Sequence, residues 1–380
     1  MSPILEARGL KRHFVTERRL FGAPTVVRAV DGVDLAIEAG ETYAIVGESG
    51  CGKSTLARLL IRLIEPSEGQ VLYGGRDIAH LPEGEMRRLR SDLQFVFQDP
   101  YASLNPRMSV GRIVGEPLET HARLSAPERR ERVAALLRRV GLRPEHMDRY
   151  PHEFSGGQRQ RVGIARALAS GPKVLVGDEP VSALDLSIQA QVINLLQDLR
   201  EEFGLTLVLI AHDLAVIRHM SNRVGVMYLG QVVEEAPSEA LFARPLHPYT
   251  QALLRAIPEP RPGAGDAPGG RTARALAGET PNPAAPPPGC RFHTRCPFAQ
   301  AVCAREAPPL APAEQGRVAC HFWREIQASG EAWRPAPAPP LRPEVERRFA
   351  LFRDGVAAAE APPDAARTTA EEDTTHAAHP

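Results

Sequence analysis

The chain has 380 residues, of which 43% are hydrophobic and 24% are charged. This length suits one domain of about 250 residues with a smaller appended part. The 46 basic residues balance the 46 acidic ones, so the formal net charge is +0. This balance excludes a general electrostatic attraction to nucleic acid.

No part of the sequence approaches the ~20 consecutive apolar residues that a membrane span needs. The first ten residues contain Glu6 and lack an apolar signal segment. We therefore expect a cytoplasmic protein. In that compartment, its five cysteines are expected to be reduced or bound to metal, not paired as structural disulfides.

From about Ile4 to Pro258, apolar runs of strand length alternate with helical patterns. Several of these runs are apolar throughout, as is typical of strands that are covered on both faces. We expect an α/β domain over residues 1–258, with a helical subdomain at about 99–165. The predicted strands are Thr42–Val46, Gln94–Phe97, Val174–Val176 and Thr206–Ile210, and the predicted helices include Leu56–Ile64 and Ala126–Leu142.

The composition changes after Pro258, where 21 of the 36 prolines lie in the last third of the chain. Residues 259–285 are rich in Pro and Gly and are predicted to be a linker. Residues 286–330 contain four of the five cysteines and are predicted to form a small loop-rich module. Residues 331–380 have little to bury, so we expect disorder there.

A glycine-rich segment at residues 47–55 fits the phosphate-loop pattern G-x-x-x-x-G-K-[ST] between a predicted strand and a predicted helix. Backbone N–H groups of such a loop close around phosphate oxygens, and the helix N-terminus adds partial positive charge. Lys53 is expected to reach the β- and γ-phosphates of ATP, and Ser54 to bind Mg²⁺. The predicted nucleotide-binding residues here are Gly47, Glu48, Ser49, Gly50, Cys51, Gly52, Lys53, Ser54 and Thr55. Cys51 is interpreted as a small filler side chain, with a redox role as the alternative.

The segment Lys173–Glu179 is an apolar strand that ends in two acidic residues. Asp178 is placed to bind Mg²⁺, directly or through water. Glu179 can polarise the water that attacks the γ-phosphate. Behind a phosphate loop at this distance, the two acids indicate ATP hydrolysis.

The segment from Phe154 to Arg161 contains Ser155, Gly156, Gly157 and Gln158 at the start of a predicted helix. Such a start offers a hydroxyl and free N–H groups to a phosphate, although a plain helix cap is the simpler interpretation. The segment resembles the signature motif of ABC ATPases. The other motifs of that family follow in order: Gln98 after a strand, Asp178–Glu179, Ser182–Asp185 and His212.

This resemblance implies a P-loop ABC ATPase fold: a RecA-like core, a helical signature subdomain and an antiparallel β subdomain. It also implies that two such domains pair head to tail around two ATP molecules. Gln98 would then sense Mg²⁺ and the attacking water, His212 would contact the γ-phosphate with Glu179, and Asp185 would link the two sites. Phe14 is the candidate to stack on adenine, with a core role as the alternative.

Three stretches resemble the dipeptide and oligopeptide importer ATPases: Phe97–Arg107, Ser182–Gln191 and His247–Leu254. Cys51 and Tyr101 resemble the F-type subunit of that group. The resemblance implies work at the cytoplasmic face of the inner membrane with a D-type ATPase, two permease subunits and an extracytoplasmic solute-binding protein, and no nucleic acid. Relatives of this group also import nickel, glutathione and some sugars.

Four late cysteines, Cys290, Cys296, Cys303 and Cys320, lie in the predicted module. Their spacing lacks the C-x₂₋₄-C pair of most zinc sites. The module has few apolar residues for a core of its own, which favours a metal over bare thiols. The resemblance to the C-terminal extension of peptide-importer ATPases implies a [4Fe-4S] cluster. Zinc and free thiols remain the alternatives.

Two other functions fit parts of the pattern. A non-transport ABC ATPase usually carries two cassettes or a long coiled-coil insertion, but 55 residues separate Gln98 from Phe154 and leave no room for one. A degenerate partner that binds ATP without hydrolysing it would lack Glu179 or His212, and the chain has both.

Overall fold

The structure is a computed structural model, and it describes residues 3–15, 24–182, 184–211, 213–256, 279–330 and 332. All of these belong to one compact unit, Met1–Pro335. The predicted disordered tail, apart from residue 332, and most of the predicted linker lie outside the described residues.

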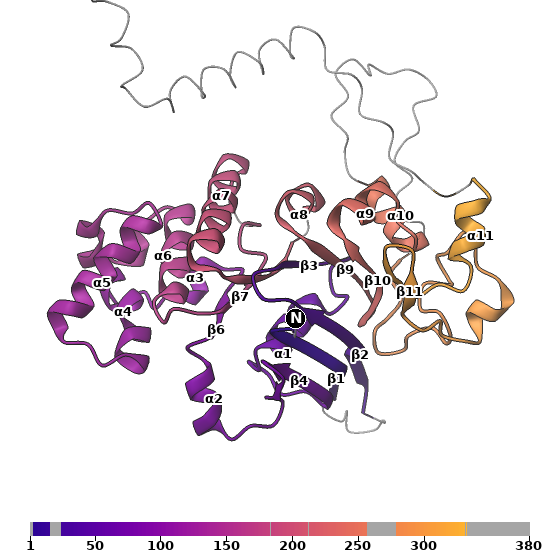
Figure 1. Cartoon of the computed structure of the whole chain (residues 1–380), viewed down its shortest axis with the longest axis horizontal. Coiled ribbons are helices and arrows are strands. Elements are labelled where there is room, and N and C mark those ends of the chain that lie inside the picture. Colours follow the sequence, from indigo (N-terminus) through magenta and orange to yellow (C-terminus); the bar gives the residue numbers. More distant parts are fainter. Residues whose placement is uncertain are drawn as a thin grey trace, which may run out of the picture. The chain divides into compact units, whose positions relative to one another are not determined.

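An eight-stranded sheet, in the order β11-β12-β10-β9-β3-β8-β7-β6, forms the centre of this unit (Figure 1). The run from β9 to β6 is parallel, and β10, β12 and β11 continue it in antiparallel fashion. Every residue of β3, β7 and β8 is buried, as their apolar sequences predict. The strands are β3 (Thr42–Val46), β6 (Leu93–Val96), β7 (Val174–Asp178), β8 (Thr206–Ile210), β9 (Arg223–Tyr228), β10 (Gln231–Pro237), β11 (Ala311–Ala313) and β12 (Gly316–Val318).

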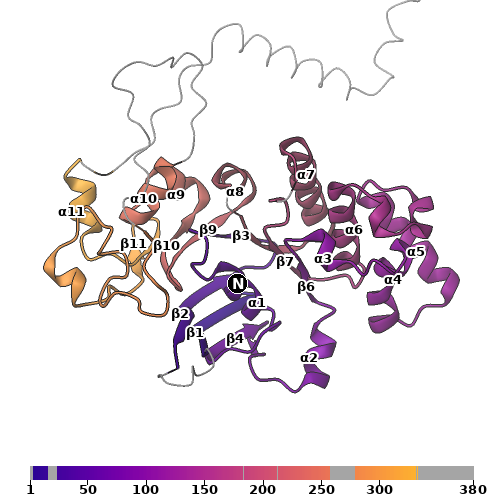
Figure 2. The same ribbon diagram turned by 180° about the vertical axis from the view of Figure 1, so that it is seen from behind.

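A second, antiparallel sheet has the order β2-β1-β4-β5. It consists of β1 (Leu5–Val15), β2 (Val26–Ile37), β4 (Glu68–Tyr73) and β5 (Arg76–Asp77). Helix α1 (Lys53–Leu60) shares a buried core with both sheets. Figures 1 and 2 show the second sheet on one side of the central sheet, with α7, α8, α9 and α10 on the other. These helices are α7 (Leu186–Phe203), α8 (Leu214–Met220), α9 (Ser238–Ala243) and α10 (Pro248–Arg255).

A group of helices lies between β6 and β7 in the sequence and packs around one apolar core. It comprises α3 (Pro100–Ser103), α4 (Val110–His121), α5 (Ala126–Arg139), α6 (Gly156–Leu168) and the 3₁₀ helices η1 (Pro144–Asp148) and η2 (Pro151–Glu153), while α2 (Glu83–Leu89) precedes β6. A capping box of Ser125 and Glu128 begins α5. The helix ends before the predicted Leu142 because Gly141 adopts a positive φ of 72°.

Two other predicted elements are displaced by a few residues. The strand predicted to end at Phe97 ends at Val96, and the Phe97 ring is partly exposed. The helix predicted over Leu56–Ile64 starts three residues earlier, at Lys53. The phosphate-loop lysine is therefore itself the first helical residue.

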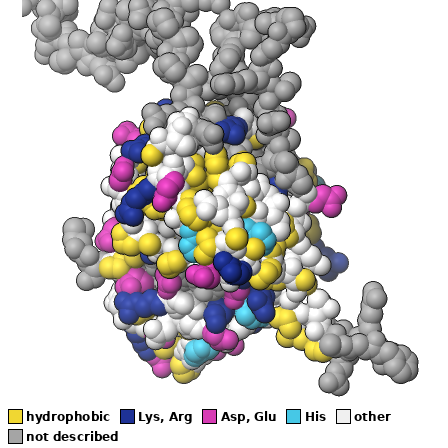
Figure 3. Space-filling model, turned by 90° about the vertical axis from the view of Figure 1, so that its right-hand side faces the viewer, with side chains coloured by type: hydrophobic (Ala, Val, Ile, Leu, Met, Phe, Trp, Pro, Cys, Tyr) yellow, Lys and Arg dark blue, Asp and Glu magenta, His cyan; other side chains and the backbone are white. Residues whose placement is uncertain are grey.

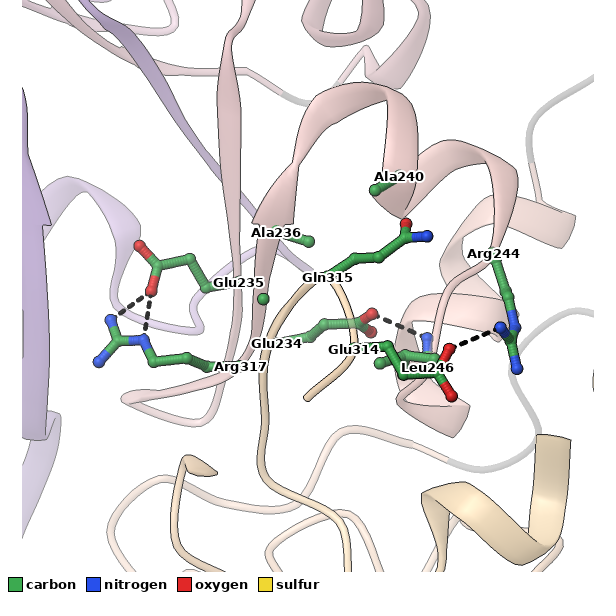
Figure 4. Close-up of a pocket in the computed structure, with 10 residues that line it drawn as sticks. Glu234, Glu235, Ala236, Ala240, Arg244, Leu246, Glu314, Gln315 and Arg317 are labelled. Carbon is green, nitrogen blue, oxygen red and sulfur yellow. Dashed lines mark hydrogen bonds and ion pairs between the residues drawn. The ribbon is translucent and has the colours of Figure 1, made fainter. Parts of the chain in front are cut away.

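The cysteine-containing segment docks on the rest of the unit instead of forming a core of its own. Besides β11 and β12, it contains η3 (Ala301–Ala304) and α11 (Trp323–Ala328). Strand β12 pairs with β10, and ion pairs flank that junction (Figure 4). Arg317 pairs with Glu235, and Arg244 pairs with Glu314 at 2.7 Å. On the face that Figure 3 shows, basic and acidic side chains are interspersed among hydrophobic ones.

Within the ranges that the structure describes, no helix combines the length and the apolar character that crossing a bilayer would require.

Candidate nucleotide site

The phosphate loop joins β3 to α1 in a conformation that needs glycine at two points. Gly52 has a φ of 106°, and a Cβ there would lie 2.0 Å from the carbonyl oxygen of Ala29. A Cβ on Gly47 would lie 2.2 Å from the carbonyl oxygen of Met227. The loop is therefore pressed against β2 and β9, and a side chain at either position would displace it.

Lys53 lies almost fully buried inside this loop, with 5% of its surface exposed. Its Nζ donates to the carbonyl oxygens of Gly47 at 2.8 Å and Glu48 at 2.9 Å. The ammonium group is thus held within the loop that would surround the phosphates. Cys51 is also buried, and burial raises the pKa of its thiol. An uncharged, enclosed thiol fits the interpretation of Cys51 as a filler.

A hydroxyl and a carboxylate meet beside the loop. Ser54 Oγ donates to Asp178 Oδ1 at 2.8 Å, which joins the start of α1 to the end of β7. Arg58 lies 3.6 Å from the other oxygen of Asp178. Oxygen ligands of this kind suit Mg²⁺, which normally keeps several waters and binds substrate phosphates. The structure brings two of the three predicted Mg²⁺ ligands, Ser54 and Asp178, together, while the third, Gln98, contacts Glu179.

Glu179 and Gln98 form a second pair at the same edge of the sheet. Gln98 Nε2 donates to Glu179 Oε2 at 2.7 Å. Glu179 is buried and has a φ of 49°, which is uncommon for a residue with a side chain. Strained backbone of this kind is concentrated at functional sites. Glu179 directly follows Asp178, the last residue of β7.

The predicted signature segment begins α6. Ser155 Oγ accepts from the backbone N–H of Gln158, whose side chain accepts from the N–H of Ser155. Ser155 is exposed. A Cβ on Gly157 would lie 2.4 Å from Ile188 Cγ2, so this helix packs closely on α7. Figures 1 and 2 show α6 beside α4 and α5, away from the start of α1.

The remaining predicted residues lie apart from the loop or outside the described residues. Asp185 is exposed just before α7. Phe14 is the penultimate residue of β1 and has 38% of its surface exposed, and the Arg12 guanidinium lies 4.8 Å from its ring centre. This exposure disagrees with the alternative interpretation, in which Phe14 is a core side chain. His212, between β8 and α8, lies outside the described residues.

The four late cysteines line one pocket and are free thiols. Burial raises the pKa of Cys296 to about 11 and that of Cys320 to about 12. Across the described ranges, no group of three or more His, Cys, Asp or Glu side chains is arranged to hold a metal ion. The four thiols share a pocket, but their arrangement does not support the expected cluster. The four cysteines that line this pocket are Cys290, Cys296, Cys303 and Cys320.

Comparison with known proteins decides the family. The family model described as ABC transporter matches residues 30–182, and the one described as oligopeptide/dipeptide transporter, C-terminal region, matches residues 233–303. The oligopeptide transport ATP-binding protein AppF of Bacillus subtilis is 53% identical over 84% of this chain and 97% of its own length. The chain belongs to the ATP-binding proteins of the oligopeptide/dipeptide ABC transporters.

Further relatives agree with this assignment. The di/tripeptide transport ATP-binding protein DppF of Pseudomonas aeruginosa is 52% identical over 84% of this chain and 98% of its own length. The oligopeptide transport ATP-binding protein OppF of Escherichia coli is 51% identical over 83% and 95%. A dimeric ATP-binding cassette bound to ADP and Pi superposes with a TM-score of 0.56 at 31% identity, covering 62% of this chain and 98% of that one. The predicted ABC ATPase fold is confirmed.

Sequence reasoning missed three residues of this chain that hold Glu48 in the phosphate loop. They are Tyr249, Thr280 and Arg295. Tyr249 lies in the His247–Leu254 stretch and Arg295 directly precedes Cys296, so the family patterns contained both. Those patterns could not show that residues some 200 to 250 positions later contact the loop.

Proposed function

We propose that this chain is the subunit that hydrolyses ATP to power the import of dipeptides or oligopeptides, or a related small solute, through an ABC importer. One arrangement carries the proposal. The phosphate loop, the Ser54–Asp178 pair and the Gln98–Glu179 pair lie together at the carboxyl ends of parallel strands. The substrate class rests on relatives that are named for oligopeptide and di/tripeptide transport.

Each residue is assigned a role in phosphoryl transfer to water. The loop from Gly47 to Thr55 binds the phosphates, and Lys53 moves from the loop carbonyls to the β- and γ-phosphates. Ser54, Asp178 and Gln98 hold Mg²⁺, which neutralises charge on the phosphates when bound. Glu179 takes the proton of the attacking water, with His212 on the γ-phosphate. Phe14 stacks on the adenine.

A second ATPase domain completes each site in this proposal. The start of α6, which carries Ser155–Gln158, lies away from this chain's own phosphate loop, so the N–H groups of Gly156 and Gly157 can reach the ATP of a partner domain. Asp185 is also exposed, and its neighbour Leu184 packs against Gly156 at the start of α6. The dimer of the similar cassette bound to ADP and Pi supports this arrangement. We assign the partner role to a D-type ATPase subunit.

We further propose a peripheral location on the cytoplasmic face of the inner membrane, with two permease subunits and an extracytoplasmic solute-binding protein. The nucleotide-binding domain spans residues 1–258, with its helical subdomain at about 99–165. A linker at 259–285 leads to the cysteine-containing module at 286–330 and a tail at 331–380. Acidic and basic side chains are interspersed on the face that Figure 3 shows, which fits a role without nucleic acid.

For the module we propose a [4Fe-4S] cluster held by the four late cysteines. Such a cluster is bound by four cysteine thiolates, each on a different iron, so its ligands are spread around a pocket. The four thiols line one pocket together with Phe292, Phe298 and Phe322. These rings would exclude water, and the cluster would crosslink the loops of the module.

The complex reconstituted in lipid with its D-type ATPase and permeases tests the importer function. ATP turnover is measured against solute-binding proteins loaded with peptides, nickel or sugars. We expect stimulation by the peptide-loaded receptor. Stimulation by a different solute alone would replace the substrate class. Basal turnover without stimulation by any receptor would overturn the proposal in favour of a non-transport ATPase.

A further inference from the structure

Glu48 of the phosphate loop is held on both its backbone and its side chain by residues from the C-terminal part of the chain. Its backbone N–H donates to the hydroxyl of Tyr249 at 2.8 Å. Its carboxylate accepts from the two terminal nitrogens of Arg295, at 2.7 and 2.9 Å, and from Thr280 Oγ1 at 3.1 Å. The contacts come from α10, from the segment before the cysteines and from the cysteine-containing module.

The Arg295–Glu48 pair is buried on the arginine side and has the geometry of a strong contact. The Arg295 side chain is 4% exposed, and each of its terminal nitrogens meets one carboxylate oxygen. Two parallel hydrogen bonds of this kind fix orientation as well as distance. Burial alone would raise the pKa of Glu48, but the contacts with Arg295 and Thr280 outweigh it, and the net pKa is lowered. Glu48 is therefore a carboxylate at neutral pH.

The position of Glu48 matters because the phosphate loop is rich in glycine. Glycines occupy positions 47, 50 and 52, and glycine loses the most conformational freedom when it is ordered. The carbonyl oxygen of Glu48 also accepts from Lys53 Nζ, so Glu48 helps to fix the position of the ammonium group that would bind the phosphates. If the loop is already ordered before ATP binds, binding loses less free energy to ordering the loop.

A second set of contacts joins the same module to the residues that pack against the phosphate loop. Arg291 donates to the carbonyl oxygen of Leu229 and pairs with Asp31. The next residue, Gly230, donates its N–H to the carbonyl oxygen of Cys51 at 2.8 Å. Phe292 packs edge-on against Tyr228, with ring centres 5.3 Å apart. The module thus contacts the loop directly through Glu48 and indirectly through the segment from Tyr228 to Gly230.

We propose that the cysteine-containing module braces the phosphate loop, and that Arg295 is a positioning residue for nucleotide binding. Arg295 acts through Glu48 and does not touch the nucleotide. The inference rests on the proposed ATPase function. It adds that nucleotide affinity depends on a residue far along the chain, next to Cys296 in the sequence.

The test compares nucleotide affinity in the full-length chain and its Arg295→Gln variant, using a fluorescent ADP analogue and Mg²⁺. We expect the dissociation constant to rise roughly tenfold, as loss of a buried bidentate pair would cause. In the reconstituted complex, KM for ATP rises while kcat is maintained. Thr280→Val, which removes one exposed contact, raises the dissociation constant less, about twofold.

Arg317→Gln is the matched control, because it removes another arginine–glutamate pair between the module and the sheet, with Glu235 and away from the loop. Its dissociation constant should equal that of the unmodified chain. The double variant Glu48→Gln/Arg295→Gln should bind no more weakly than either single variant, because both remove one shared contact.

Three results would count against the brace. An unchanged dissociation constant in Arg295→Gln overturns it, provided that Lys53→Ala abolishes binding. An equal loss in Arg317→Gln also overturns it, because the effect is then general. If Arg295→Gln does not fold, the Thr280→Val and Glu48→Gln variants decide in its place, and normal affinity in both rejects the brace. Absence of binding by the unmodified chain instead contradicts the ATPase function.

Discussion

Gln98 and Glu179 meet through a 2.7 Å hydrogen bond from Gln98 Nε2 to Glu179 Oε2. They come from segments that follow two paired strands, β6 and β7, so the parallel pairing of those strands sets their separation. The bond leaves the carboxylate fixed at the edge of the sheet where the proposed Mg²⁺ ligands Ser54 and Asp178 also lie. This arrangement predicts what replacing the carboxylate should do.

Glu179→Gln should bind ATP but lose at least about 100-fold in turnover. The amide keeps an acceptor for Gln98, so the local structure should hold, but it cannot take the proton of the attacking water. Turnover by phosphate release and dimer formation by light scattering with ATP are the measurements. We expect a trapped dimer. Unaffected turnover would show that Glu179 is not the catalytic base.

Lys53→Ala should abolish measurable nucleotide binding at micromolar concentrations. The ammonium is the cation that the buried loop holds ready for the phosphates, and loss of a charge-assisted contact costs about 3 kcal/mol, or roughly 100-fold in affinity. Lys173→Ala is the control, because that lysine forms an exposed ion pair with Asp92. Equal affinity in the two variants would remove Lys53 from the site.

Much of the candidate nucleotide site could be predicted, because each of its motifs is local in the sequence. The phosphate loop, the acids after β7 and the signature segment each place their chemistry within about ten residues, between elements that apolar periodicity reveals. Strands β3 and β8 have the bounds that the sequence predicts for them. The start of α1 escapes prediction because loop glycines conceal that Lys53 already has helical geometry.

The docking of the C-terminal module could not be predicted in the same way. Its contacts are pairs such as Arg295 with Glu48 and Arg317 with Glu235, which join residues 247 and 82 positions apart. No periodicity links such partners. The sequence indicates that the module lacks apolar residues for its own core, and the structure gives the reason: Phe292 and Trp323 pack against residues of the nucleotide domain.

Gly157→Ala should destabilise the signature helix. The added Cβ would lie 2.4 Å from Ile188 Cγ2, so α6 and α7 must separate. We expect a loss of about 1–3 kcal/mol in the free energy of unfolding. Gly163→Ala, in the same helix with nothing within 4 Å, should instead gain up to about 1 kcal/mol. Urea unfolding monitored by circular dichroism measures both, and equal effects would contradict the close packing.

Cys296→Ser should lower the iron and acid-labile sulfide content of protein purified without oxygen. The proposed cluster needs all four thiolates, and one hydroxyl ligand weakens it. Cys51→Ser is the matched control, because Cys51 lies in the phosphate loop and not in the cysteine pocket. Its iron content should match that of the unmodified chain. Protein that contains neither iron nor sulfide before mutation would reject the cluster.

Glu234 should make the unfolding stability depend on pH. Its side chain is buried, is drawn between the two ion pairs in Figure 4, and accepts from the backbone N–H groups of Leu246 and His247, each at 2.8 Å. Burial raises its pKa from 4.5 to about 7 despite these contacts. His247 has a pKa of about 3 because of burial, so it stays neutral above pH 4.5.

The sign of this pH dependence follows from whether Glu234 holds a proton in the folded and in the unfolded chain. Between pH 4.5 and 7 the folded chain keeps the Glu234 proton that the unfolded chain loses, so stability falls as pH rises through this window and is then constant with respect to this group. The slope is at most about 1.4 kcal/mol per pH unit. Glu234→Gln cannot titrate, so its stability relative to the unmodified chain should improve from about pH 5.5 to about pH 7.5. Urea midpoints at both values test this, and other groups cancel in the difference. A difference independent of pH would show that Glu234 is ionised in the folded chain throughout.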